Sequence, residues 1–223
     1  MKYEIKKTEI STSFKGEWDS PVWKTANTLR IDNFRKESSD HRPDVKARIL
    51  YGDKGLYGIF KVEDRFVRSV SIEFQDPVCR DSCVEFFFEP KAGCGYFNFE
   101  FNCGGTFLCY YISDHSRIDK GFRAFVKLTP SDAEVVKIYH SMPKVVDPEI
   151  ADHTTWRLEF FIPFALIEKY VGVLGNIEGQ LWKGNLYKCA DATSHPHWAS
   201  WSPVDELNFH LPKCFGELVF AEK

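Results

Sequence analysis

The sequence predicts an all-β fold: an antiparallel β-sandwich of two sheets, of the immunoglobulin or jelly-roll type, with one or two short helices in the connections. Short apolar segments bounded by Gly-containing turns recur along the chain, whereas segments with a helical period are scarce. The 20 Phe, 9 Tyr and 6 Trp supply enough apolar bulk for a core, and no Pro/Gly/Ser-rich linker divides the chain. We therefore expect residues 1–223 to form a single domain.

Strands are expected wherever an apolar or alternating segment ends at a turn residue. The first two flank the turn Gly-Asp-Lys-Gly, which is a hairpin pattern. Pro163, near the first turn of 163–170, predicts a short helix there, and 21–26 adds one helical turn. In order, the expected strands are 45–51, 56–63, 83–89, 95–102, 106–112, 122–128, 134–141, 155–162, 181–188 and 214–220.

The strand over 95–102 alternates strictly between aromatic and polar residues. Its three Phe side chains share one face, which we expect to pack in the core. We expect the other, polar face to meet solvent, with a concave sheet that faces a ligand as the alternative interpretation. That polar face carries Tyr96, Asn98, Glu100 and Asn102.

Composition and charge disfavour two classes of partner, nucleic acids and membranes. The net charge is −3 with acidic and basic residues interspersed, so we expect no nucleic-acid partner. No apolar run approaches the length of about 18 residues that spans a membrane, so we expect no membrane partner.

The seven cysteines are an odd number without a Cys-x-x-Cys pair, which indicates mostly buried thiols. With no signal peptide at its start, the chain favours a cytoplasmic location, although a secreted mature chain would look the same.

The segment 185–203 is the strongest candidate for a site, because it packs two Trp, two His, an Asp and two Pro without a regular apolar period. Rings beside hydrogen-bonding groups indicate a flat, polar ligand such as a sugar, whose C–H face meets an aromatic plane while its hydroxyls meet planar donors and acceptors. A core lid made of two Trp is the alternative. For a mono- or oligosaccharide partner, we expect Trp198 and Trp201 to stack on the ring and Glu85, Glu100, Asn102 and His197 to bind hydroxyls, with Arg80 as a further donor.

The chain carries no motif of the common enzyme classes, so we assign no catalytic residue and expect a binding protein rather than an enzyme. A glycoside-acting enzyme that uses the same cleft is one alternative. Its two opposed carboxylates could come from Asp81, Glu85, Glu89 and Glu100. A structural interaction domain without a sugar ligand, in which the Trp-His loop is internal packing, is the other alternative.

The sequence requires no cofactor, and its metal content is open. Cys189, Asp191, His195 and His197 form a loose transition-metal set, but the proline between the two histidines restricts how their imidazoles can turn. The acidic segment 147–152 allows calcium as a structural ion, with a solvated loop as the alternative.

Over nearly its whole length the chain resembles carbohydrate-binding module family 9, specifically its single-domain branch. The segments that carry the resemblance occur in a fixed order, and together they are fairly specific. They are Trp18–Trp23, Arg42–Tyr51, Leu56–Asp64, Arg80–Phe87, Tyr96–Asn102, Trp156–Pro163, the segment around His195, and Phe209–Gly216.

This resemblance implies a β-sandwich that binds sugars without cleaving them, in a family linked to polysaccharide breakdown. It also implies that calcium sometimes serves as a structural ion. Members hold a sugar between two Trp planes, but here the first of these positions falls in Pro77–Cys79 and the second near Phe209. The family's carboxylate position matches Glu85, and its polar strand position matches Glu100 with Asn102 beside it. The resemblance therefore implies that any aromatic platform is built from Trp198, Trp201 or Phe209.

Overall fold

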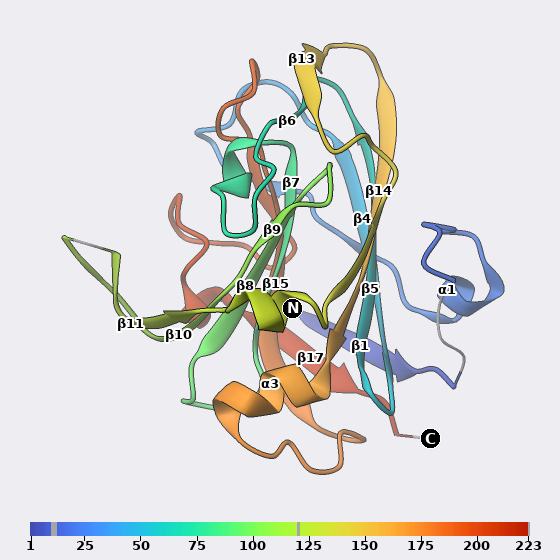
Figure 1. Ribbon diagram of the computed structural model, residues 1–223, viewed down its shortest axis with the longest axis vertical. Helices are drawn as coiled ribbons and strands as arrows, with labels where there is room; N and C mark the ends of the chain where they lie inside the picture. Colours follow the sequence, from blue (N-terminus) through green and yellow to red (C-terminus); the bar gives the residue numbers. More distant parts are fainter. Residues whose placement is uncertain (10–12, 120, 223) are drawn as a thin grey trace.

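The computed structural model describes residues 1–9, 13–119 and 121–222, in which β-strands are the predominant secondary structure (Figure 1). In chain order the strands are β1 (Lys2–Lys7), β2 (Leu29–Arg30), β3 (Asn33–Phe34), β4 (Asp44–Gly52), β5 (Gly55–Asp64), β6 (Val67–Ser69), β7 (Cys83–Glu89), β8 (Tyr96–Asn102), β9 (Phe107–Leu108), β10 (Tyr110–Ile118), β11 (Gly121–Lys127), β12 (Lys137–His140), β13 (Val146–Ile150), β14 (Thr154–Pro163), β15 (Leu181–Cys189), β16 (Trp198–Ser200) and β17 (Gly216–Phe220). The helical segments are α1 (Pro21–Thr25), α2 (Pro130–Ala133), α3 (Phe164–Val171) and the 3₁₀ turns η1 (Val78–Arg80) and η2 (Pro212–Cys214). No helix in the described residues has the length and apolar character needed to cross a bilayer.

The local predictions are largely confirmed. Gly52 of β4 pairs with Gly55 of β5, so the expected hairpin closes over the intervening Asp-Lys. Both expected helices occur, as α1 and α3. Two expected strands are modified: the strand over 106–112 breaks at Cys109 into β9 and the start of β10, and the strand over 134–141 shortens to β12 because a helical turn precedes it.

The strands pack as two layers that face each other across the core (Figure 1). One layer contains β7, β8, β15 and β17, and the other contains β4, β5 and β14. The Phe160 ring of β14 joins them, because its centroid lies 5.2 Å from the Phe101 ring of β8 and 6.1 Å from the Phe86 ring of β7. At the lower end of the layers α3 adds Leu166 and Ile167 to the same core. The predicted core face of β8 is therefore confirmed.

The expectation of two separate antiparallel sheets is corrected by β1. Residues 2–5 of β1 pair in parallel with β17, and residues 6–7 pair in parallel with β4. The two layers are consequently one continuous, mixed sheet that folds over itself through β1. The sequence prediction omitted this strand, although Tyr3 and Ile5 alternate with charged residues as in a half-buried strand.

The polar face of β8 is buried and does not meet solvent as expected. Asn98 is 1%, Glu100 6% and Asn102 0% exposed. Three other parts of the chain contribute to the cavity above this face: η1, residues 207–210, and the β10–β11 hairpin, which continues the sheet beside β8 and reaches away from the body in Figure 1. The side of β8 that faces away from the core therefore forms the floor of a cavity.

Candidate functional site

The cavity floor is formed where β15, β7 and β8 lie side by side. In the strand register, Glu85 of β7 lies opposite Glu100 of β8, and Cys83 of β7 lies opposite Cys189 of β15. Because side chains two residues apart on a strand share a face, these four side chains point to the same side of the sheet. The floor therefore combines carboxyl and thiol groups within a few strand positions.

The cavity above this floor has a volume of about 340 Å³. Its walls come from segments that are far apart in the sequence, namely η1, the tip of β10, and the two loops on either side of β16. The lining residues are Cys79, Glu85, Glu100, Arg117, Cys189, Asp191, Trp198, Leu207, Asn208, Phe209 and His210. The family's clamp positions would fall in Pro77–Cys79 and near Phe209, and Cys79 and Phe209 line this cavity.

Two aromatic side chains, Trp198 and Phe209, form its apolar surface. All six tryptophans lie in the described residues, and Trp198 is the one that is not buried, since the other five are at most 7% exposed. The Trp198 indole Nε1 donates to Asp191 Oδ1 at 2.7 Å, which fixes the ring at the cavity wall. The Phe209 ring stacks on Tyr187 at 4.1 Å between centroids and 12° between planes. The site thus presents two aromatic rings held by their neighbours.

The two buried glutamates supply the hydrogen-bond acceptors of the floor. Glu100 Oε1 accepts from Asn98 Nδ2 at 2.8 Å, and Glu85 Oε1 accepts from the Cys189 thiol at 3.0 Å. The other oxygen of Glu85, Oε2, is buried and has no partner among the described residues. A buried polar atom without a partner costs free energy, so Glu85 is a natural contact point for a ligand.

Burial also changes the protonation of this floor. Burial, followed by repulsion from Glu100, raises the pKa of Glu85 well above its ordinary value. Burial raises the pKa of Glu100 to about 7. The two carboxyl groups lie opposite each other on adjacent strands, so ionising one disfavours ionising the other. Near neutral pH this floor can therefore both donate and accept hydrogen bonds.

Two of the residues expected to bind sugar lie outside the cavity. Trp201 is 4% exposed and packs in the core edge-on against Tyr3, with ring centroids 6.3 Å apart. Stacking on a sugar does not fit that position, because a buried ring has no face open to solvent. Asn102 is fully buried, and its amide donates to Ser71 O and to Asp81 Oδ2 at 2.9 Å each. Its amide is committed to the protein, so we leave both residues out of the proposed site.

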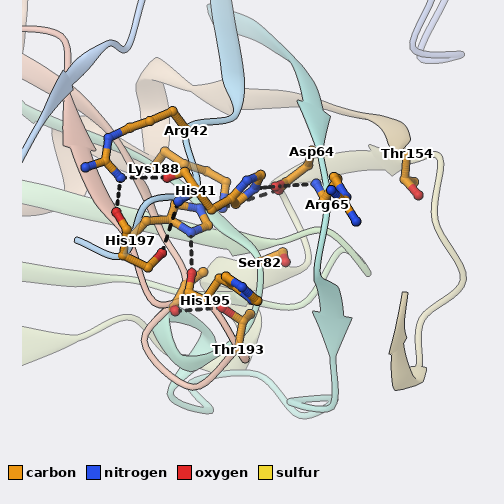
Figure 2. A network of polar contacts seen from close by, with 12 residues as sticks. His41, Arg42, Asp64, Arg65, Ser82, Thr154, Lys188, Thr193, His195 and His197 are labelled. Carbon is orange, nitrogen blue, oxygen red and sulfur yellow. Dashed lines mark hydrogen bonds and ion pairs between the residues drawn. The ribbon is translucent and has the colours of Figure 1, made fainter. Parts of the chain in front are cut away.

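His197 also lies outside the cavity, in a buried cluster that the sequence did not indicate (Figure 2). The Lys188 ammonium donates to His197 Nε2 at 2.8 Å and lies 3.5 Å from Asp64 Oδ2. His41 Nε2 lies 2.7 Å from the other oxygen of Asp64. Burial, and then the charge of Lys188, lower the pKa of His197 to about 3, so its imidazole is neutral at ordinary pH. Burial alone would raise the pKa of Asp64, but Lys188 and His41 hold it well below its usual range.

The structure brings together Glu85, Glu100 and Trp198, and adds residues that sequence reasoning missed. Arg117, Asn208 and His210 line the cavity; Asn208 and His210 follow the aromatic segment 185–203 by a few residues, whereas Arg117 is distant from it in the sequence. No local pattern could have identified Arg117, because it reaches the site from the tip of a long hairpin. Phe209 could be found only through the family resemblance.

Calcium does not fit the side chains that converge in the described residues. Ca²⁺ takes about six to eight oxygen ligands. The two groups of three whose ligand atoms lie within 4.8 Å of one another contain nitrogen or sulfur: His41, Asp64 and His197, and Cys83, Glu85 and Cys189. In the acidic segment, the Glu149 carboxylate accepts hydrogen bonds from the backbone N–H and hydroxyl of Ser194. Structural calcium therefore stays a prediction from the sequence alone.

Comparison with known proteins agrees with this architecture. The family model described as carbohydrate-binding family 9 matches residues 21–220. A crystal structure of a candidate carbohydrate-binding protein from Bacteroides uniformis is similar with 28% sequence identity, covers 98% of both chains and has a TM-score of 0.85. A family 9 carbohydrate-binding module from Caldicellulosiruptor kristjanssonii in complex with cellotriose has 11% identity and a TM-score of 0.61, covering 100% of this chain and 95% of that one. The same type of module in complex with glucose has 12% identity and a TM-score of 0.57, covering 99% and 96%. No curated protein sequence matches the chain.

Proposed function

Since this chain belongs to carbohydrate-binding family 9, we propose that residues 1–223 act as one non-catalytic domain that binds a short saccharide in the cavity beside Trp198. The observation that carries the proposal is that two partly exposed aromatic rings and an unpaired buried acceptor converge in a single cavity. Glucose and cellotriose, which occupy the similar modules, make glucose-type sugars the first ligands to test.

The cavity chemistry supports a neutral sugar. The Trp198 and Phe209 rings present apolar surface to the C–H face of a pyranose, and Glu85 Oε2 is available to accept from a hydroxyl. Arg117 and Asn208 add donors at the wall. The cavity of about 340 Å³ is at the small end of the range of about 300–1,000 Å³ for ligand pockets, which favours one or two sugar units.

Hydrolysis is less well supported than binding. A glycosidase places its two carboxyl groups on either side of the bond that it cleaves. Glu85 and Glu100 instead lie side by side on one face of the sheet, and Asp81 is buried in bonds to backbone N–H groups of Val70 and Ser71. We therefore propose binding without turnover.

The test uses tryptophan emission, because Trp198 is the one indole at the cavity. We expect glucose and cello-oligosaccharides to change the emission saturably, with a dissociation constant on the order of micromolar to millimolar. Trp198→Ala should abolish the change, and Glu85→Gln should weaken binding by about tenfold because a hydrogen bond to a buried carboxyl is altered. Glu89→Gln, on the same strand but outside the cavity, is the matched control and should bind normally.

The titration is run with a chelator present, so that its outcome does not depend on metal ions. Calorimetry on the same samples checks that the optical change reports binding. A folded protein that shows no saturable response to a panel of mono- and oligosaccharides by either method contradicts the proposal. Release of reducing sugar by wild type, abolished in Glu85→Gln, would instead establish the hydrolase alternative.

A further inference from the structure

A buried group of ionisable side chains lies at and just beneath the cavity floor, and the proposed sugar site uses only Glu85 of this group. Cys83 and Glu85 share one face of β7, and Cys189 lies directly opposite Cys83 on β15. One ligand atom from each of the three lies within 4.8 Å of the other two. All three residues are almost fully buried, at 0%, 2% and 1% exposed in that order. We propose that Cys83, Glu85 and Cys189 bind one thiophilic divalent cation of the Zn²⁺ class at the floor of the cavity.

The donor set matches this class of ion. Two sulfurs and one carboxylate oxygen are ligands that Zn²⁺ accepts, whereas Ca²⁺ and Mg²⁺ select oxygen. Zn–S bonds of about 2.3 Å and Zn–O bonds of about 2.1 Å require the ligand atoms to lie within about 4 Å of one another, so only small side-chain shifts would close the group on a metal. Glu85 and Cys189 line the cavity, so the fourth position would open toward it and could take water.

An independent observation points to a missing ligand at this place. Glu85 Oε1 already accepts from the Cys189 thiol, but Oε2 is buried and unpaired among the described residues. Buried polar atoms in native proteins normally have a bonding partner, and a cation bound by Glu85 would be the partner of Oε2.

The buried cluster around Asp64 shows what a satisfied group of the same kind looks like in this protein. His41, Asp64 and His197 also converge, but the Lys188 ammonium lies among them, 2.8 Å from His197 Nε2 and 3.5 Å from Asp64 Oδ2 (Figure 2). No ion pair in the described part of the chain reaches Glu85. One cluster has its own cation, and the other has none.

In the metal-free protein, burial favours the protonated forms of all three side chains. Burial raises the pKa of Cys83 to about 12 and raises the pKa values of Cys189 and Glu85 well above their usual ranges. On binding, each thiol loses its proton to buffer and becomes a thiolate ligand, and Glu85 binds as the carboxylate after losing any proton it holds. Metal affinity should therefore increase as the pH rises.

The experiment is a Co²⁺ titration of the full chain, reduced, free of air and stripped of metal. We expect one equivalent to produce thiolate-to-cobalt charge-transfer absorption in the near ultraviolet and intense visible bands of tetrahedral cobalt, both removed by Zn²⁺. Cys189→Ser and Glu85→Gln should each weaken binding by at least about tenfold. Cys94→Ser, a thiol outside the cavity, is the matched control and should titrate like wild type.

The proposal is overturned if wild type gives no charge-transfer band, or if Cys189→Ser gives the same band as wild type. If Cys189→Ser does not fold, the wild-type titration alone tests the proposal, because the charge-transfer band reports sulfur ligation directly. Zn²⁺ should also raise the unfolding temperature of wild type. This experiment contains no sugar, and the sugar titration contains a chelator, so failure of one proposal is distinguishable from failure of the other.

Discussion

Replacing Lys188 by methionine is expected to destabilise the protein by about 3 kcal/mol or more. The substitution removes the ammonium group from a buried cluster, so the buried Asp64 carboxylate loses its positively charged neighbour. Lys188 and Asp64 are both fully buried in their side chains, at 0% exposed each. Methionine has a similar length and flexibility, so the change removes the charge while leaving most of the packing.

The magnitude follows from the remaining partners of Asp64. Breaking a buried pair by removing one member costs about 3–5 kcal/mol. Asp64 keeps a hydrogen bond from Trp156 Nε1 at 3.2 Å. It also keeps the bond from the backbone N–H of Arg65 at 2.9 Å and the 2.7 Å contact to His41, both residues being labelled in Figure 2. These contacts offset part of the loss, so we expect the lower end of that range.

Urea unfolding followed by tryptophan emission measures this loss, with equal slopes in both proteins as the check on two-state behaviour. The matched control is Lys183→Met. Lys183 lies on the same strand and pairs with Glu217 at 3.2 Å, but both side chains are about 40% exposed. An exposed pair contributes about 0–1 kcal/mol, so the control should change little.

The pH dependence gives a second, signed test of the same variant. In wild type, burial and then the charge of Lys188 both lower the pKa of His197, to about 3. Without Lys188 that pKa should rise, so below it His197 takes up a proton in the folded state and supplies the missing positive charge. The deficit of Lys188→Met relative to wild type should therefore shrink as the pH falls from 7.5 toward 5. A loss below about 1 kcal/mol at pH 7.5, or a deficit that grows on acidification, would refute this account of the cluster.

Three further outcomes follow from burial and packing. Burial raises the pKa of Glu100 from 4.5 to about 7. The resulting stabilisation of the folded state, about 3 kcal/mol, is fully present below pH 4.5 and is lost as the pH rises through about 7. In urea titrations, the difference in unfolding free energy between wild type and Glu100→Gln should therefore fall over that interval. Trp201→Ala should cost about 3–5 kcal/mol in the same assay, whereas Trp198→Ala should cost about 1 kcal/mol or less, and equal losses would contradict their assigned places. Gly58→Ala should cost about 1–3 kcal/mol, because its Cβ would lie 2.0 Å from the Phe160 ring, and an unchanged melting temperature would show that the ring can move aside.

Much of the fold was readable from local patterns. Alternation over residues 96–102 placed its three Phe side chains on one face, and the Gly-Asp-Lys-Gly turn located the hairpin between β4 and β5. Both patterns depend on residues only a few positions apart, so the sequence contains them directly. The family resemblance extended this to the two carboxyl positions, Glu85 and Glu100.

The composition of the site could be predicted from the sequence only in part. Trp198 and Trp201 are three residues apart and look equivalent in the sequence, yet one ring reaches the cavity and the other packs in the core. The polar row of β8 was expected to meet solvent, and its burial depends on a hairpin and a loop from elsewhere in the chain. Neither outcome is visible locally, because each depends on which distant segment covers that face.

The sequence by itself determined most of the longer strands, the hairpin turn between β4 and β5 and the aromatic content of this protein, because strand period and turn chemistry act over a few residues. Only the tertiary structure decided that β1 joins the two layers into one sheet, that Cys83, Glu85 and Cys189 meet on one floor, and that Lys188 lies beside Asp64. Most of those contacts join residues that are more than 100 positions apart in the sequence, as the pairing of Lys2 with Glu217 does. They are set by strand register and by the packing of the whole core, in which a shift of one residue would turn each side chain to the opposite face.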